Sequence, residues 1–360
     1  MQNSSLMTPD KSLVRFSCKA CAAVTSGAEL VQGRCPACGA ELSDDIGLFD
    51  FRTRDEDYYF LDLPRSEIDE LLQVLKEQGW REALRDVERK YTAIRPHLVK
   101  LMVDSTRAAW VYLTRPAAFE NVLEIGCGWG GAVPTLASQF DHVFAVDLTK
   151  ERIRFAQLRC LEMGIKNASF GIGFDSPNLP FASDTFDLVA MNGVLAYTPL
   201  LFPGKPRSAQ LEFLSEVCRT VRPGGAIYVG SQNRFGWPYL LGAREHSHLK
   251  WTSVMPQRMA NMYCKIRLGT EYRTLKYTAK GYRKLLKEAG FREVEVYWPH
   301  HSHEAFRMIT SLDKKGTNFM LNTTLKWSEG GGLRRKVVRM ANFFGMFTPF
   351  VPSFCIVGRK

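Results

Sequence analysis

Four cysteines near the amino terminus have the spacing of a metal site. Cys18 and Cys21 form one Cys-x-x-Cys pair, Cys35 and Cys38 form a second, and 13 residues separate the pairs. Each pair can form a tight turn that directs two thiolates at one ion, and so short a segment has few apolar residues with which to fold alone. The pattern therefore predicts a closed, structural zinc site. Disulfides are the alternative, but no secretory signal supports an oxidising compartment.

A glycine-rich run follows a short apolar stretch of the chain. Residues 122–125 predict a buried parallel strand, and Gly126 and Gly128 then allow a tight backbone turn against a ligand. Asp147 ends the next apolar run, residues 142–146, where a carboxylate can accept hydrogen bonds from ribose hydroxyls. The run predicts a nucleotide-like cofactor. A dinucleotide fingerprint, simple helix packing by the glycines and a helix cap at Asp147 remain open.

Histidines gather in two segments that could supply acid–base chemistry. A histidine or carboxylate in a closed pocket can accept a proton from a hydroxyl nucleophile. Metal binding and a plain surface loop are the alternatives for these residues. The candidates for a general base are Glu245, His246, His248, His300, His301 and His303.

Alternating apolar runs and helical patterns must position these groups. They predict an α/β fold with a doubly wound, seven-stranded, Rossmann-like sheet, a small amino-terminal zinc ribbon and helical cap and insertions. Asn192 and Gly193 follow a predicted strand, and ligands gather at the carboxyl ends of such strands. We expect a zinc ribbon over residues 1–50 and a helical cap or linker over 51–115. The remaining residues, 116–360, form the third domain, with insertions at about 231–272 and 300–350.

The ordered set of motifs resembles the class I S-adenosylmethionine (SAM) dependent methyltransferases. The glycine turn, Asp147, Asp175, the run at 184–189 and the Arg-Pro-Gly-Gly turn at 222–225 follow one another as in that family. The resemblance implies SAM as cofactor, held by the glycine turn and by acids after the second and third strands. The residues that it implies for SAM binding are Glu124, Gly126, Cys127, Gly128, Asp147, Leu148, Asp175, Ser176, Asn192 and Gly193.

The acceptor is suggested by a weaker resemblance. Residues 233–236, Asn-Arg-Phe-Gly, and 272–274, Tyr-Arg-Thr, are similar to segments of bacterial methyltransferases found with glycan-assembly enzymes. This favours O-methylation of a sugar or glycan, as a surface polysaccharide or a lipid-linked precursor. Methylation of ribosomal or transfer RNA, methylation of a natural product or quinone, and a non-catalytic zinc-ribbon binding module are the alternatives.

Charge is distributed unevenly along the chain. Residues 1–200 carry 21 Lys and Arg against 27 Asp and Glu, whereas residues 201–360 carry 27 against 10. The basic half favours an acidic or lipid-linked acceptor, with RNA as an alternative partner. Residues 333–354 mix basic and aromatic side chains, a composition that suits peripheral membrane contact or a helix packed on its own domain. Without a secretory signal or a long apolar span, we expect a cytoplasmic protein, either free or peripheral to the inner face of the membrane.

Overall fold

The computed structural model describes residues 14–26, 29, 33–43, 47–54, 63–93, 98–245, 247–327 and 348–360. They fold into two compact units. Unit 1 comprises the chain up to Met191 together with Glu216–Ile227 and Lys360, and unit 2 comprises Asn192–Ser215 and Tyr228–Arg359. The candidate base His246 and most of the predicted membrane segment, residues 333–347, lie outside the described residues.

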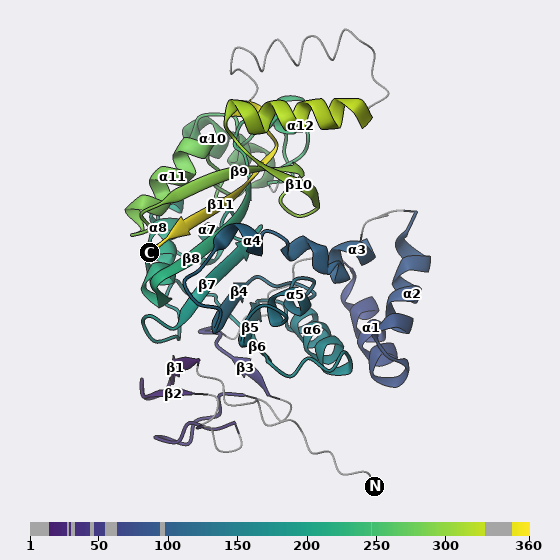
Figure 1. Ribbon diagram of the computed structural model, residues 1–360, viewed down its shortest axis with the longest axis vertical. Helices are drawn as coiled ribbons and strands as arrows, with labels where there is room; N and C mark the ends of the chain where they lie inside the picture. The colour runs from purple at the N-terminus through teal and green to yellow at the C-terminus, as the bar shows by residue number, and fades with distance from the viewer. Residues whose placement is uncertain are drawn as a thin grey trace. The chain divides into compact units, whose positions relative to one another are not determined.

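The strands form one nine-stranded sheet and one two-stranded sheet (Figure 1). They are β1 (Arg15–Ser17), β2 (Val24–Ser26), β3 (Leu48–Asp50), β4 (Asn121–Ile125), β5 (His142–Asp147), β6 (Ala168–Ile172), β7 (Phe186–Asn192), β8 (Val221–Gln232), β9 (Val294–His301), β10 (Phe306–Ser311) and β11 (Ser353–Arg359). The order in the large sheet is β10-β9-β11-β8-β7-β4-β5-β6-β3. This arrangement confirms the predicted α/β class.

Strand direction follows the expected pattern. β4 pairs in parallel with β5 and β7, and β6 pairs in parallel with β5 and β3. β9 pairs antiparallel with β10 and β11. Every residue of β4 and β5 is buried, as the continuous apolar runs predict for strands covered on both faces. The large sheet has nine strands rather than the predicted seven, and the two additional strands are β3 and β10. β3 has only three residues, and β10 lies inside the segment that was assigned to the second insertion.

The helices of unit 1 build a layer beside the sheet. Helix α1 packs on α2 and α6, and α2 also contacts α3 (Figure 1). Buried leucines of α1 meet Trp129 and Phe155 in one apolar cluster. The helices are α1 (Arg65–Gln78), α2 (Trp80–Tyr91), α3 (Leu98–Val103), η2 (Ser105–Ala108), α4 (Val111–Thr114), α5 (Val133–Ala137) and α6 (Lys150–Glu162).

Unit 2 contains both predicted insertions. The first, at about 231–272, forms α9 (Trp237–Leu240) and α10 (Gln257–Leu268). The second begins later than expected, because β9 continues through His301 and pairs with β10 in a hairpin. The other helices are α7 (Thr198–Leu201), α8 (Pro206–Thr220, which continues into unit 1), α11 (Ala279–Glu288), α12 (Lys314–Trp327) and η3 (Thr348–Phe350). Of the helices in the described ranges, none is both long and apolar enough to span a bilayer.

Candidate cofactor, acceptor and metal sites

The glycine turn after β4 is locked onto the end of β5. The backbone N–H groups of Gly126 and Cys127 both donate to the carbonyl oxygen of Val146, at 2.8 and 3.0 Å. The Asp147 carboxylate accepts from the Gly128 N–H at 2.8 Å through Oδ2 and from the Thr149 N–H at 2.9 Å through Oδ1. One carboxylate thus fixes both the turn and the start of α6.

The glycines divide into two roles. Gly126, Gly128 and Gly130 all have positive φ, between 56° and 73°, a region that glycine adopts without steric cost. A Cβ added at Gly130 would lie 2.6 Å from the Cβ of Ala156 on α6, so this glycine is required for helix packing. A Cβ at Gly128 would meet nothing within 4 Å. Gly128 therefore borders open space, as a backbone that contacts a ligand must.

Glu124 is a buried carboxyl group next to this turn. Within the described part of the chain, its Oε2 atom has no hydrogen-bond partner. Burial raises the pKa of Glu124 to about 8, with Arg107 opposing the shift and Asp147 adding to it. Burial also raises the pKa of the Cys127 thiol well above its usual value, which favours the protonated thiol over the thiolate.

The third predicted acid has a different environment. Asp175 is fully buried, and its carboxylate accepts from the N–H and hydroxyl of Thr53 and from the N–H of Arg54, at 2.8 to 3.0 Å. Asp175 therefore anchors the segment that follows β3. The Ser176 hydroxyl accepts from the Asn178 N–H at 3.3 Å, and Leu148 is half-buried.

Unit 2 brings one predicted histidine next to Asn192 and Gly193. His303 is buried in the β9–β10 hairpin, and its carbonyl oxygen accepts from Asn192 Nδ2 at 3.1 Å. A Cβ added at Gly193 would lie 3.7 Å from His303 Nε2 and 3.5 Å from Glu304 Oε1. The backbone N–H of His303 donates to Ser353 Oγ at 3.0 Å, which fixes the hairpin on β11. A buried imidazole thus lies at the carboxyl end of β7.

The other predicted base candidates have different surroundings. Glu245 forms a fully buried ion pair with Lys276 at 3.0 Å and also accepts from the Ser253 N–H at 2.7 Å. His248 and His301 are exposed. Burial and the neighbouring His301 and Arg307 lower the pKa of His300 to about 4, so that its imidazole is neutral at physiological pH. Lys276 was not singled out in the sequence, because nothing local marks it as the partner of Glu245.

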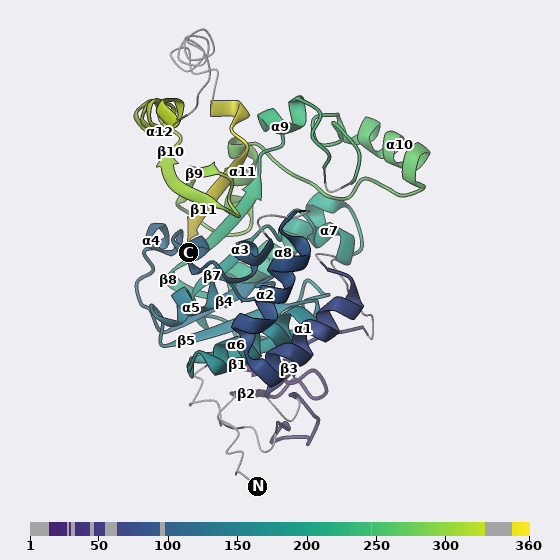
Figure 2. The same ribbon diagram turned by 90° about the vertical axis from the view of Figure 1, so that its right-hand side faces the viewer.

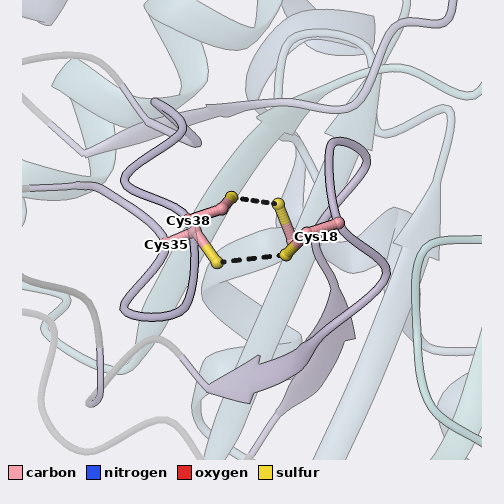
Figure 3. A group of neighbouring side chains, drawn as sticks. Cys18, Cys35 and Cys38 are labelled. Atoms are coloured by element: carbon pink, nitrogen blue, oxygen red, sulfur yellow. Dashed lines mark hydrogen bonds between the residues drawn. The ribbon is translucent and has the colours of Figure 1, made fainter.

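The four amino-terminal cysteines converge (Figure 3). Their sulfur atoms all lie within 4.8 Å of one another. The distances from Cys18 Sγ to Cys38 Sγ and from Cys21 Sγ to Cys35 Sγ are 3.7 and 3.8 Å. Four thiolates on a zinc ion at about 2.3 Å would be separated by about 3.8 Å, whereas a disulfide requires about 2 Å. The sulfur positions therefore fit a tetrahedral, structural ion.

The cysteine segment is held on unit 1 by backbone and aromatic contacts. The Ser17 N–H donates to the Pro180 carbonyl at 2.6 Å, and the Ala182 N–H donates to the Arg15 carbonyl at 3.0 Å. Phe16 is buried against Phe49 and Phe51 at ring-centroid distances of 5.3 and 5.9 Å. The segment thus covers part of the apolar core next to β3.

Comparison with known proteins agrees with this geometry. Residues 122–225, which contain β4 and the glycine turn, match the family described as "Methyltransferase domain". The chain carries a class I SAM-dependent methyltransferase domain. Residues of this domain thus include Glu124, Gly126, Gly128 and Asp147.

Relatives of this methyltransferase include ubiquinone biosynthesis O-methyltransferases. The protein from Thiobacillus denitrificans is 26% identical over 181 residues, which cover 47% of this chain and 73% of the relative. That from Aeromonas salmonicida is 26% identical over 39% of this chain and 55% of its own length. For the second relative, the chain therefore spans about half of its length. A solved SAM-dependent methyltransferase from Thermotoga maritima has a TM-score of 0.42 at 16% identity and covers 76% of this chain and 97% of its own.

Proposed function

We propose that this methyltransferase transfers a methyl group to a hydroxyl oxygen, with His303 as the general base. The position of His303 carries the proposal: its side chain is buried, its backbone carbonyl accepts from Asn192 at the end of β7, and a Cβ added at Gly193 would lie 3.7 Å from its Nε2 atom. Methyl transfer from a sulfonium is a direct displacement, so the protein mainly aligns the nucleophile and excludes water. A hydroxyl nucleophile must also lose a proton, and a neutral imidazole can accept it.

The residues around the glycine turn fit SAM. When bound, SAM supplies the electrophilic methyl group. Gly126 and Gly128 would offer backbone to it, because a Cβ at Gly128 meets only open space. Asp147 would hold the ribose with the lone pairs left after its two backbone hydrogen bonds. Glu124 offers an unpartnered buried oxygen, suited to a cationic or hydrogen-bond-donating group.

The acceptor that we propose is a hydroxyl on a glycan or small molecule. The relatives are named O-methyltransferases, which supports oxygen as the accepting atom. The sugar or glycan predicted from the sequence is the first class to test, and a quinone precursor is the second. The cysteine segment packs on its own unit through Phe16, which supports a structural role for the zinc ribbon rather than recognition of RNA.

The decisive experiment separates cofactor binding from chemistry. SAM affinity is measured by calorimetry, and methyl transfer is measured with radiolabelled SAM against lipid-linked glycans, quinone precursors and RNA. We expect His303→Gln to reduce kcat about 10²- to 10⁴-fold and to leave the Kd for SAM unchanged. His248→Gln is the matched control, because His248 is exposed. Full activity of the His303→Gln protein would rule out this base, and absence of SAM binding would favour the non-catalytic binding module.

A further inference from the structure

Exposed apolar side chains are concentrated in the first insertion of unit 2. Among the described residues, eight of the sixteen large apolar side chains that face solvent lie between residues 237 and 268. Isolated apolar residues on a surface are ordinary, but such a concentration marks an interaction surface. The eight are Trp237, Leu240, Leu241, Trp251, Met259, Met262, Ile266 and Leu268.

Helix α10 presents three of these residues as a stripe. Met259, Met262 and Ile266 are spaced three and four residues apart, which places them on one face of a helix. Ile266 is 73% exposed. Ala260 and Cys264, on another face, are buried and attach the helix to its unit. The apolar stripe is therefore not the face with which α10 packs on its own unit.

Basic residues flank the stripe. Arg258, Lys265 and Arg267 are exposed, and α10 contains no Asp or Glu. Helical geometry places Arg258 and Lys265 on one side of the stripe and Arg267 on the other. Lys265 forms an ion pair with Glu271 at 3.0 Å, but both side chains are more than half exposed, so the pair is weak and exchangeable. An apolar stripe between basic borders is typical of a helix that lies in a membrane interface.

A second apolar group in the same insertion includes two tryptophans. Leu241 is 78% exposed, and Trp237 and Trp251 are both close to half exposed. Trp251 Nε1 donates to the Leu240 carbonyl at 3.3 Å, and the Lys250 ammonium lies 6.0 Å from the Trp251 ring. Tryptophan prefers the boundary between lipid headgroups and acyl chains, because one end of its ring system is apolar and the other is polar.

Buried polar contacts hold the insertion in this shape. The Glu245–Lys276 ion pair lies at its base, with the Lys276 ammonium 4.0 Å from the Tyr239 ring. Arg234 donates to the carbonyls of Ser253 and Met255, at 2.7 and 2.9 Å. Figure 2 shows α9 and α10 on one side of β9 and β11, with α10 farther from these strands. The apolar residues are therefore presented on a fixed support.

We infer that the insertion of residues 237–268 docks this protein on an anionic phospholipid surface. Charge identifies the partner: residues 237–268 contain Arg244, Lys250, Arg258, Lys265 and Arg267, and the one acid within these bounds, Glu245, is buried against Lys276. Glu271, three residues beyond, offsets only Lys265. Apolar residues enter the headgroup region, while the basic side chains pair with lipid phosphates.

Vesicle sedimentation of the full-length protein tests this inference. We expect binding to phosphatidylcholine vesicles that contain about one quarter phosphatidylglycerol, weak binding to pure phosphatidylcholine, and a loss of binding in high salt. Replacing Met259, Met262 and Ile266 together by Gln should weaken binding about tenfold or more. Arg258→Gln with Arg267→Gln should weaken binding to the anionic vesicles alone.

The matched control changes exposed apolar residues elsewhere. Leu161→Gln with Met163→Gln, at the end of α6, should leave vesicle binding unchanged. Equal binding of the wild type and the triple α10 variant would overturn the inference, as would equal binding to neutral and anionic vesicles. Concentration-dependent dimerisation that the triple variant removes, without vesicle binding by the wild type, would instead assign the surface to a second copy of the chain.

Discussion

Replacing Glu124 by Gln tests the electrostatics of the cofactor site. The folded protein holds this carboxyl group in a buried position, where its pKa is raised to about 8 from an ordinary value of 4.5. Between these two pH values, the folded chain keeps a proton that the unfolded chain releases. The free energy of unfolding contributed by this group is therefore fully present below about pH 4.5 and is lost as the pH rises to about 8.

The size of the change in the free energy of unfolding follows from the shift in the pKa of Glu124. A difference of about 3.5 pKa units corresponds to a change of the order of 5 kcal/mol in the free energy of unfolding, at most about 1.4 kcal/mol for each pH unit. The glutamine amide has similar shape and does not ionise. The Glu124→Gln protein should therefore lack this slope and become progressively more stable than the wild type towards alkaline pH.

Urea unfolding followed by intrinsic fluorescence, from about pH 5.5 to about pH 8.5, measures the slope. Glu77→Gln is the control, because Glu77 is exposed on α1 and its replacement should keep the wild-type slope. Parallel curves of the free energy of unfolding against pH for wild type and Glu124→Gln would refute the assigned burial effect.

The same substitution affects SAM binding. Because SAM is cationic, its binding should favour the ionised form of the Glu124 carboxyl group, which then releases a proton. Calorimetry in buffers of different ionisation enthalpy should therefore detect proton release for the wild type only.

Three further predictions concern packing and metal. Lys276→Met should lower the free energy of unfolding by about 3 to 5 kcal/mol, because Glu245 would stay buried without its partner. Adding Glu245→Gln to this variant should restore much of the lost stability. Urea unfolding would measure both changes. Gly130→Ala should destabilise the fold by about 2 kcal/mol or more through a clash with α6, whereas Gly128→Ala should mainly raise the Kd for SAM in calorimetry. Elemental analysis should find about one zinc ion per chain. The Cys35→Ser protein should lose this ion, and its ribbon should become sensitive to proteolysis. Full zinc retention by that variant would contradict the four-cysteine site.

Features encoded by short-range spacing were predictable from the sequence. Within each Cys-x-x-Cys pair, the turn itself brings the two sulfur atoms together. The fold then has only to bring one pair next to the other for all four sulfur atoms to converge. The glycine turn follows β4 as expected, because positive φ angles and a buried apolar run are properties of consecutive residues. The α/β class followed from the alternation of such segments.

Long-range pairing could not be predicted in the same way. Asp175 was predicted as a cofactor ligand from its place in the motif order, but nothing in the sequence indicated that its carboxylate accepts from the backbone of Thr53 and Arg54, more than a hundred residues away. Glu245 was predicted as one of several candidate bases, and its buried ion pair with Lys276, 31 residues later, could not be predicted from the sequence. A sequence pattern identifies which residues can carry a charge, but it does not identify the residue that pairs with each buried charge in the folded chain.

The difference in burial among the three neighbouring histidines is likewise a property of the tertiary structure. His300, His301 and His303 are almost adjacent in sequence, but a strand directs successive side chains to opposite faces and the hairpin turn buries only His303 fully. The exposure of the apolar stripe on α10 is also decided by tertiary packing. Helical spacing in the sequence defines the apolar face, but packing decides whether solvent or protein covers that face. The sequence by itself determined the methyltransferase motifs and the four-cysteine pattern, whereas tertiary packing decided which titratable groups are buried and which apolar faces stay exposed.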